Sequence, residues 1–134
     1  MKIFAVIDTN VLVSALIKWS SVPGRVMVAA LFGAVQPMVH EEILAEYHNM
    51  LQRNKFHFDP EAVELFIEQL RLRAISVGRT ASSKNFIDSD DKIFYEATLG
   101  ARELGDAYLV TGNTRHFPHE PFVVTPRQML SVIE

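Results

Sequence analysis

The carboxylates are the groups in this sequence whose types and positions could do chemistry. Asp8 ends an apolar run, Glu46 lies in an amphipathic segment, and Asp90 and Asp91 open a later one. The chain has no cysteine, which excludes thiolate ligands, thiolate nucleophiles and disulfides. Clustered carboxylates raise one another's pKa unless a cation is present, and a hard cation such as Mg²⁺ or Mn²⁺ removes that conflict. The usual chemistry of such a centre is phosphate-ester cleavage by metal-activated water.

Asp8 follows a strand-like segment. The apolar run from Ile3 to Ile7 predicts a strand over residues 2–8 that is buried on both faces, and a helix over 10–17 follows it. An acid at the carboxyl end of such a strand lies where open α/β sheets bind their ligands. Helix capping by Asp8, Thr9 or Asn10 explains the same residues equally well at this point.

Glu46 is the acid of its helix best placed to reach a cleft beside the core. The apolar residues of a helix over 40–51 span about 120° of arc, and Glu46 lies at the edge of that stripe. Asp88, Asp90 and Asp91 stand at the mouth of a helix that Gly105 closes. Helix capping explains these three acids on their own, and solvation explains Glu46.

The remaining pattern places these acids at one edge of a sheet. The alternation of strands and helices predicts an α/β fold in which a parallel or mostly parallel sheet carries helices on both faces. Strand carboxyl ends then gather the acids, with Asn113 closing a later strand. The further predicted elements are helices over 25–32, 60–72 and 127–133, strands over 35–39, 74–77, 106–113 and 122–124 (the last at an edge), and a surface loop over 78–85.

Length and charge limit the classes of protein to consider. The 134 residues have the size of one domain, residues 1–134, and no apolar run reaches the ~18 residues needed to cross a membrane. The start of the chain lacks a signal-peptide pattern, so we expect a cytoplasmic protein. The net charge of −3 is not that of a protein that binds nucleic acid by bulk electrostatics. Arg115 and Lys92 are the basic residues nearest the acids in the sequence, and His116 is a further candidate for contacting phosphate, although solvation explains each of them.

Several motifs, in order along nearly the whole chain, resemble the PIN domain. They are Asp8-Thr9-Asn10-Val11 after a strand, Ile43-Leu44-Ala45-Glu46-Tyr47, Asp90-Asp91-Lys92-Ile93-Phe94, and Leu109-Val110-Thr111-Gly112-Asn113. The resemblance implies a three-layer α/β/α fold with a central, mostly parallel five-stranded sheet. It implies an endoribonuclease that depends on Mg²⁺ or Mn²⁺. The chain is most similar to single-domain bacterial members assigned as toxins of toxin–antitoxin pairs, which implies an RNA substrate, an antitoxin partner and a homodimer.

Carried over position by position, the resemblance makes Asp8, Glu46 and Asp91 the catalytic, metal-binding acids. Asp90 is a neighbouring alternative for Asp91 as a metal ligand.

Asn10, Thr111 and Asn113 are further candidates for lining the site. Many PIN domains have an aspartate where this chain has Asn113, and an asparagine keeps an oxygen ligand but loses the charge. This difference favours an alternative function, that of a catalytically weakened PIN-like module that acts by binding protein or RNA.

Overall fold

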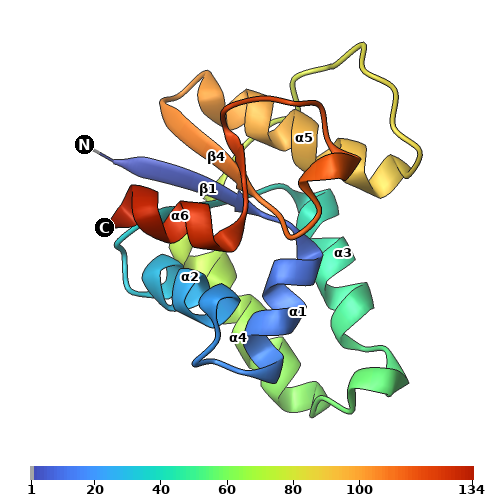
Figure 1. Ribbon diagram of the computed structural model, residues 1–134. Coiled ribbons are helices and arrows are strands. Elements are labelled where there is room, and N and C mark those ends of the chain that lie inside the picture. The colour runs from blue at the N-terminus through green and yellow to red at the C-terminus, as the bar shows by residue number, and fades with distance from the viewer. Residues whose placement is uncertain (1) are drawn as a thin grey trace.

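The computed structural model describes residues 2–134 and shows a central sheet covered by helices on both faces (Figure 1). The strands are β1 (Ile3–Ile7), β2 (Gln36–Val39), β3 (Ile75–Ser76), β4 (Asp106–Val110) and β5 (Val123–Val124). The α-helices are α1 (Thr9–Ile17), α2 (Val22–Leu31), α3 (Glu41–Leu51), α4 (Pro60–Arg73), α5 (Ser89–Arg102) and α6 (Pro126–Ile133). Two short 3₁₀ helices, η1 (Asn54–Phe56) and η2 (Thr114–His116), complete the order.

The sheet has the strand order β3-β2-β1-β4-β5. The four strand pairings are all parallel, whereas the prediction was of a parallel or mostly parallel sheet. Figure 1 shows α5 on one side of the sheet and α1, α2, α4 and α6 on the other. The α/β prediction and the three-layer α/β/α architecture are therefore confirmed, as is the position of β5 at an edge.

The centre of the sheet is the core of the molecule. Ala5, Val6 and Ile7 of β1 are buried, as are Leu109 and Val110 of β4. Strands covered by helices on both faces read as continuous apolar runs, which is the pattern that predicts β1 from the sequence. Because β1 and β4 pair from end to end, the residues that follow them emerge side by side at one edge.

Several boundaries differ from their predictions. The strand predicted over 106–113 ends at Val110, and the start of α2 differs most among the helices with predicted bounds. Helix α2 begins at Val22 rather than at residue 25, because the Ser21 hydroxyl accepts a hydrogen bond (3.1 Å) from the Gly24 N–H and so caps the helix earlier. Pro23 lies in the first turn, where no hydrogen bond from its nitrogen is needed.

Residues 78–88, which we call the strap, lead from β3 to α5 without regular structure except at their end. The strap lies so close to α5 that a Cβ on Gly100 would meet the Gly78 oxygen at 2.1 Å, so that only glycine fits there. Buried Glu96 of α5 also binds the strap, because it accepts hydrogen bonds from the Arg79 guanidinium (2.7 Å) and the Ser82 N–H (2.8 Å). The predicted surface loop 78–85 is therefore anchored to the middle and the last turns of α5.

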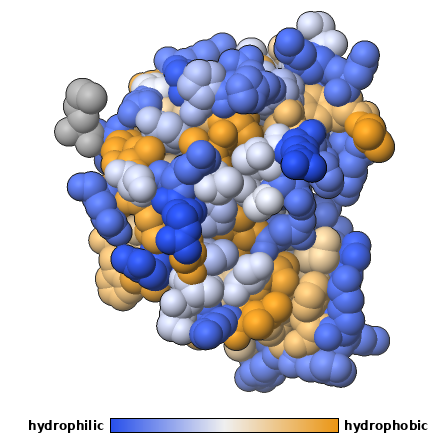
Figure 2. Space-filling model, in the orientation of Figure 1, coloured by the Kyte–Doolittle hydropathy of each residue, from blue (hydrophilic) through white to orange (hydrophobic). Residues whose placement is uncertain are grey.

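The face of the molecule seen in Figure 2 is mostly hydrophilic. Hydrophobic side chains are exposed on it in separate patches, one of them over the lower part of the molecule where α1 lies. Within residues 2–134, no single helix is long and apolar enough to cross a membrane. Helices α1 and α2 reach that length and apolar composition only when taken together, and the chain bends by 101° between them.

Candidate active site

A cavity of about 250 Å³ opens between the first turn of α1, one side of α3 and the start of α5. We call it the acid cavity, because five of its lining side chains are carboxylates. Its lining residues are Asp8, Thr9, Asn10, Glu46, Met50, Arg53, Asp88, Asp90, Asp91 and Phe94. The structure thus brings together all four acids that the sequence analysis nominates, and these acids come from three separate elements.

Asp8 is held rigidly at the carboxyl end of β1. Its N–H donates to the Val110 oxygen (2.9 Å), which extends the pairing with β4 by one residue. The Thr111 hydroxyl donates to Asp8 Oδ2 (2.7 Å) and itself accepts from the Asn113 N–H (3.0 Å). Burial raises the pKa of Asp8, and the hydrogen bond from Thr111 opposes that rise. Asp8 is the N-cap residue of α1, as the capping alternative has it, although its side chain makes no regular cap hydrogen bond. The backbone N–H groups of Thr9 and Asn10 also oppose the rise in the pKa of Asp8.

Glu46 is positioned by the residue that follows it. Tyr47 is buried, and its hydroxyl donates to the Ile7 oxygen (2.5 Å), which ties α3 to the last residue of β1. Glu46 therefore lies at the rim of the cavity next to Asp8. Burial and the nearby charge of Asp90 raise the pKa of Glu46.

The acids at the start of α5 divide between two roles. Asp88 caps the helix, since its carboxylate accepts from the Asp90 N–H (2.9 Å), so the capping prediction is confirmed for this residue. The Asp91 side chain is only 18% exposed, and burial together with the charge of Asp8 raises its pKa to about 6. His116 Nδ1 lies 3.7 Å from Asp91 Oδ2. Asp90 is exposed. Of the two residues, Asp91 is therefore the one whose pKa responds to the charge of Asp8.

The three further candidates differ in their placement. Asn10 lines the acid cavity, and Thr111 contacts it through Asp8. Asn113 is exposed and lies outside the lining of the cavity, and only its backbone N–H takes part in the hydrogen bonds around Asp8. The asparagine side chain at this position is therefore not part of the cavity wall.

Two residues at the site escape the sequence analysis. Arg53 is the cation that lines the acid cavity, whereas Arg115 lines a different cavity and Lys92 is absent from the lining. The available signal was closeness in the sequence, because Arg53 comes shortly after the end of the helix that carries Glu46 and Met50. The signal for the hydrogen bond of Tyr47 was the position of this residue in an apolar stripe. That position indicates burial, and a buried tyrosine hydroxyl needs a hydrogen-bond partner.

The donor set fits a hard divalent cation better than any other ligand class. All of its candidate donors are carboxylate, amide or hydroxyl oxygens. The pKa values of Asp8, Glu46 and Asp91 are all raised, which is the electrostatic conflict that a cation would relieve. Thr9 Oγ1 is buried at the same place without a hydrogen-bond partner. In the part of the chain that the structure describes, no three acid or histidine side chains are arranged closely enough to hold a metal.

Comparison with known proteins gives one family. A model of the PIN domain matches residues 5–115, a stretch that contains every residue lining the acid cavity. No match to the chain was found among curated proteins.

Proposed function

Because this chain belongs to the PIN domain family, whose members are generally nucleases, we propose that it is a metal-dependent endoribonuclease. It cleaves RNA phosphodiester bonds with water as the nucleophile, at the acid cavity. The observation that carries the proposal is the convergence of Asp8, Glu46 and Asp91 from three elements on one cavity.

Asp8, Glu46 and Asp91 would hold Mg²⁺ or Mn²⁺, with Asp90 as a neighbouring carboxylate. In such a site the cation supplies Lewis-acid activation of water and of the phosphoryl group. The chain itself contributes orientation: the hydrogen bond from Thr111 fixes Asp8, and the hydrogen bond of Tyr47 fixes the helix that bears Glu46.

One side chain of the cavity can contact a phosphate directly. The guanidinium of Arg53 offers donors that match phosphate oxygens. No side-chain nucleophile is needed for this reaction.

The test is an RNA-cleavage assay with Mg²⁺ or Mn²⁺ and with a chelator, on the wild type and on Asp8→Asn. We expect the chelator to abolish cleavage by the wild type, and Asp8→Asn to be inactive although its circular dichroism is unchanged. Asp106→Asn is the matched control, because Asp106 is exposed at the start of β4, the opposite end of the strand from the site. Cleavage by Asp8→Asn at the wild-type rate would show that the assignment is wrong.

A second candidate function is a catalytically weakened PIN-like module that acts by binding protein or RNA. It is favoured by the separation of the acids and by an asparagine at position 113, where many PIN domains have an aspartate. Stabilisation by Mn²⁺ discriminates between the two, because a module without a working metal site gains none.

We further propose that the chain is the toxin of a toxin–antitoxin pair, acts as a homodimer and works in the cytoplasm. Support comes from the similarity of its motifs to those of single-domain bacterial PIN toxins. Expression of the wild type should arrest bacterial growth, and expression of Asp8→Asn should not. Light scattering after size exclusion measures the oligomeric state.

A further inference from the structure

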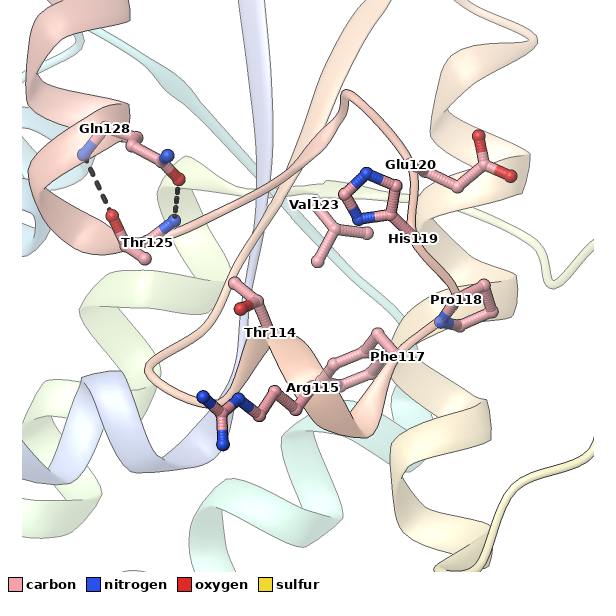
Figure 3. Close-up of a pocket in the computed structure, with 9 residues that line it drawn as sticks. All are labelled: Thr114, Arg115, Phe117, Pro118, His119, Glu120, Val123, Thr125 and Gln128. Carbon is pink, nitrogen blue, oxygen red and sulfur yellow. Dashed lines mark hydrogen bonds between the residues drawn. The ribbon is translucent and has the colours of Figure 1, made fainter.

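A second cavity is lined in part by η2, the short helix whose last residue, His116, lies next to Asp91 of the acid cavity. It measures about 430 Å³, large enough for a nucleotide, and we call it the η2 cavity. Its lining residues are Thr114, Arg115, Phe117, Pro118, His119, Glu120, Val123, Thr125 and Gln128. Figure 3 shows these side chains around the hollow, with Arg115 along its lower side and Gln128 and Thr125 at its far end.

The helix η2 connects the two cavities. Thr114 and Arg115 line the η2 cavity, whereas the next residue, His116, lies 3.7 Å from Asp91 in the acid cavity. Three residues before η2, Thr111 hydrogen-bonds to Asp8. Because Val110 and Val124 pair in register, both cavities also lie at the same carboxyl edge of the sheet. A chain molecule that occupies the acid cavity therefore meets the η2 cavity as it leaves in this direction.

The cations near the η2 cavity are not used by the fold. Elsewhere in the protein, Arg53 lines the acid cavity. The other arginines hydrogen-bond to a neighbour, namely Arg25, Arg71, Arg73, Arg79 and Arg102. Arg115 and Arg127, by contrast, make no side-chain hydrogen bond or ion pair within residues 2–134, and both are exposed. Arg127 also lies in the first turn of α6, where the helix dipole disfavours a positive charge.

Only some of the polar side chains that line the η2 cavity have hydrogen-bond partners within the described residues. Thr125 and Gln128 satisfy each other in a capping box at the start of α6, as the dashed lines in Figure 3 show. The side chains of Thr114 and His119 have no partner within residues 2–134, and Glu120 is the single carboxylate of the lining. The cavity between α3 and α4, by comparison, is lined by three glutamates, and its one arginine, Arg71, is already paired with Glu41.

We propose that the η2 cavity is a subsite for the RNA strand, where Arg115 binds the phosphate of a nucleotide next to the scissile bond and Arg127 assists. The inference rests on the proposed function, since it takes the acid cavity as the place of cleavage. The five carboxylates of the acid cavity repel every phosphate but the one a cation neutralises. In a chain of net charge −3, local uncommitted cations must hold the flanking phosphates, and Arg115 and Arg127 supply them.

The test measures RNA binding without cleavage, in the Asp8→Asn background with Mg²⁺ present. The probe is a short fluorescein-labelled single-stranded oligouridylate, followed by fluorescence anisotropy across a salt series. We expect Arg115→Gln to weaken binding about tenfold and to lower the slope of log affinity against log salt by about 0.7, the value for one phosphate contact to a single strand. Arg127→Gln changes both in the same direction. Lys18→Gln, which removes an exposed charge at the other end of α1, leaves affinity and slope unchanged.

The outcomes separate this subsite from the proposed function. If both arginine variants bind the oligouridylate with the parent's affinity and salt slope while the wild type cleaves RNA, the subsite is wrong and the nuclease stands. If the wild type cleaves nothing but binding still depends on Arg115, the nuclease is wrong and the subsite stands. The subsite would also be wrong if the two arginine variants bound RNA as the parent does but lost binding to a protein partner.

Discussion

At the scale of single residues, the acid cavity holds carboxylates in positions where burial makes their charged form unfavourable. Burial raises the pKa of Asp8 and Asp91, and both lie against apolar side chains of the core. The fold offsets this through neutral hydrogen-bond donors, of which Thr111 is the closest to Asp8. Sites that must bind an ion are expected to be electrostatically unfavourable when that ion is removed.

Thr111 is a positioning residue for Asp8, and its hydroxyl carries that role. Thr111→Val keeps the shape of the side chain but removes the hydrogen bond to Asp8, so we expect about a 10- to 100-fold loss of metal affinity and of RNA cleavage. Thr111→Ser retains the hydroxyl and should restore most of both. Calorimetric titration with Mn²⁺ provides the measurement. Equal behaviour of the valine and serine variants would mean that the hydroxyl does not orient Asp8.

Asp91 should make the metal-free protein less stable as the pH rises. Its pKa of about 6 lies above the 3.8 of an ordinary aspartate, so between these values the folded state holds a proton that the unfolded chain has lost. Stability from this group is therefore complete below about pH 4 and is lost through pH 6. Asp91→Asn should be about 1 kcal/mol more stable than the wild type at pH 8, a figure reduced for solvent screening.

Urea unfolding with a chelator, at pH 4 and at pH 8, measures this difference. The variant and the wild type should converge at the lower pH. A variant that is equally or less stable at pH 8 would contradict the assignment of an unfavourable buried charge to Asp91.

Much of the candidate site was predictable from the sequence, because strand ends and the helices that follow them meet at one edge of a parallel sheet. Asp8 follows β1 directly, whereas Glu46 and Asp91 lie on α3 and α5, the helices that follow β2 and β3. Asn113 was predicted at the site from its place after a strand, but the chain turns into η2 there and the side chain stays exposed. Arg53 was missed because it follows the last residue of α3, where the helical pattern of apolar residues has already ended.

At the scale of elements, Arg79 holds the two helices that carry Glu46 and Asp91. Its guanidinium donates to Glu42 of α3 (2.7 Å) and to Glu96 of α5 (2.7 Å). Although burial opposes it, the hydrogen bonds from Ser82 and Arg79 keep the pKa of Glu96 below its usual value, so this carboxylate is charged in the core. This bridge connects α3 and α5, two of the helices that line the acid cavity.

Arg79→Gln should destabilise the protein by about 2 kcal/mol, because it leaves the buried Glu96 charge without its main partner. Adding Glu96→Gln removes that charge, so the double variant should lose less than the sum of the two single losses. Urea unfolding of the four proteins gives the coupling. Strictly additive losses would show that Arg79 and Glu96 do not act as a pair.

The order and type of the elements followed from local patterns, whereas the strand order did not. Apolar runs such as Ile3–Ile7 identify buried strands, and Asp59-Pro60 marks the start of α4. The arrangement β3-β2-β1-β4-β5 depends on contacts between distant parts of the chain, which no local period encodes. The anchoring of the strap by Glu96 was likewise hidden, because an acid within a helix reads as solvated until its partner Arg79 is placed.

At the scale of the whole molecule, an acidic protein must handle an acidic polymer. The net charge of −3 and the five carboxylates of the acid cavity oppose RNA unless a cation enters. The cation and the uncommitted arginines near η2 divide that task between the scissile phosphate and its neighbour. Cation binding by the acid cavity is therefore the claim on which the rest depends.

The thermal unfolding midpoint, measured with and without Mn²⁺, tests that claim most directly. At about a hundredfold excess over Kd, the wild-type Tm should rise by about 10 °C, because only the folded state holds the acids together. Glu46→Gln should lose this rise, whereas Glu41→Gln, on the same helix but outside the acid cavity, should keep it. A wild-type Tm that Mn²⁺ leaves unmoved, or a Glu46→Gln variant stabilised as much as the wild type, would contradict the account.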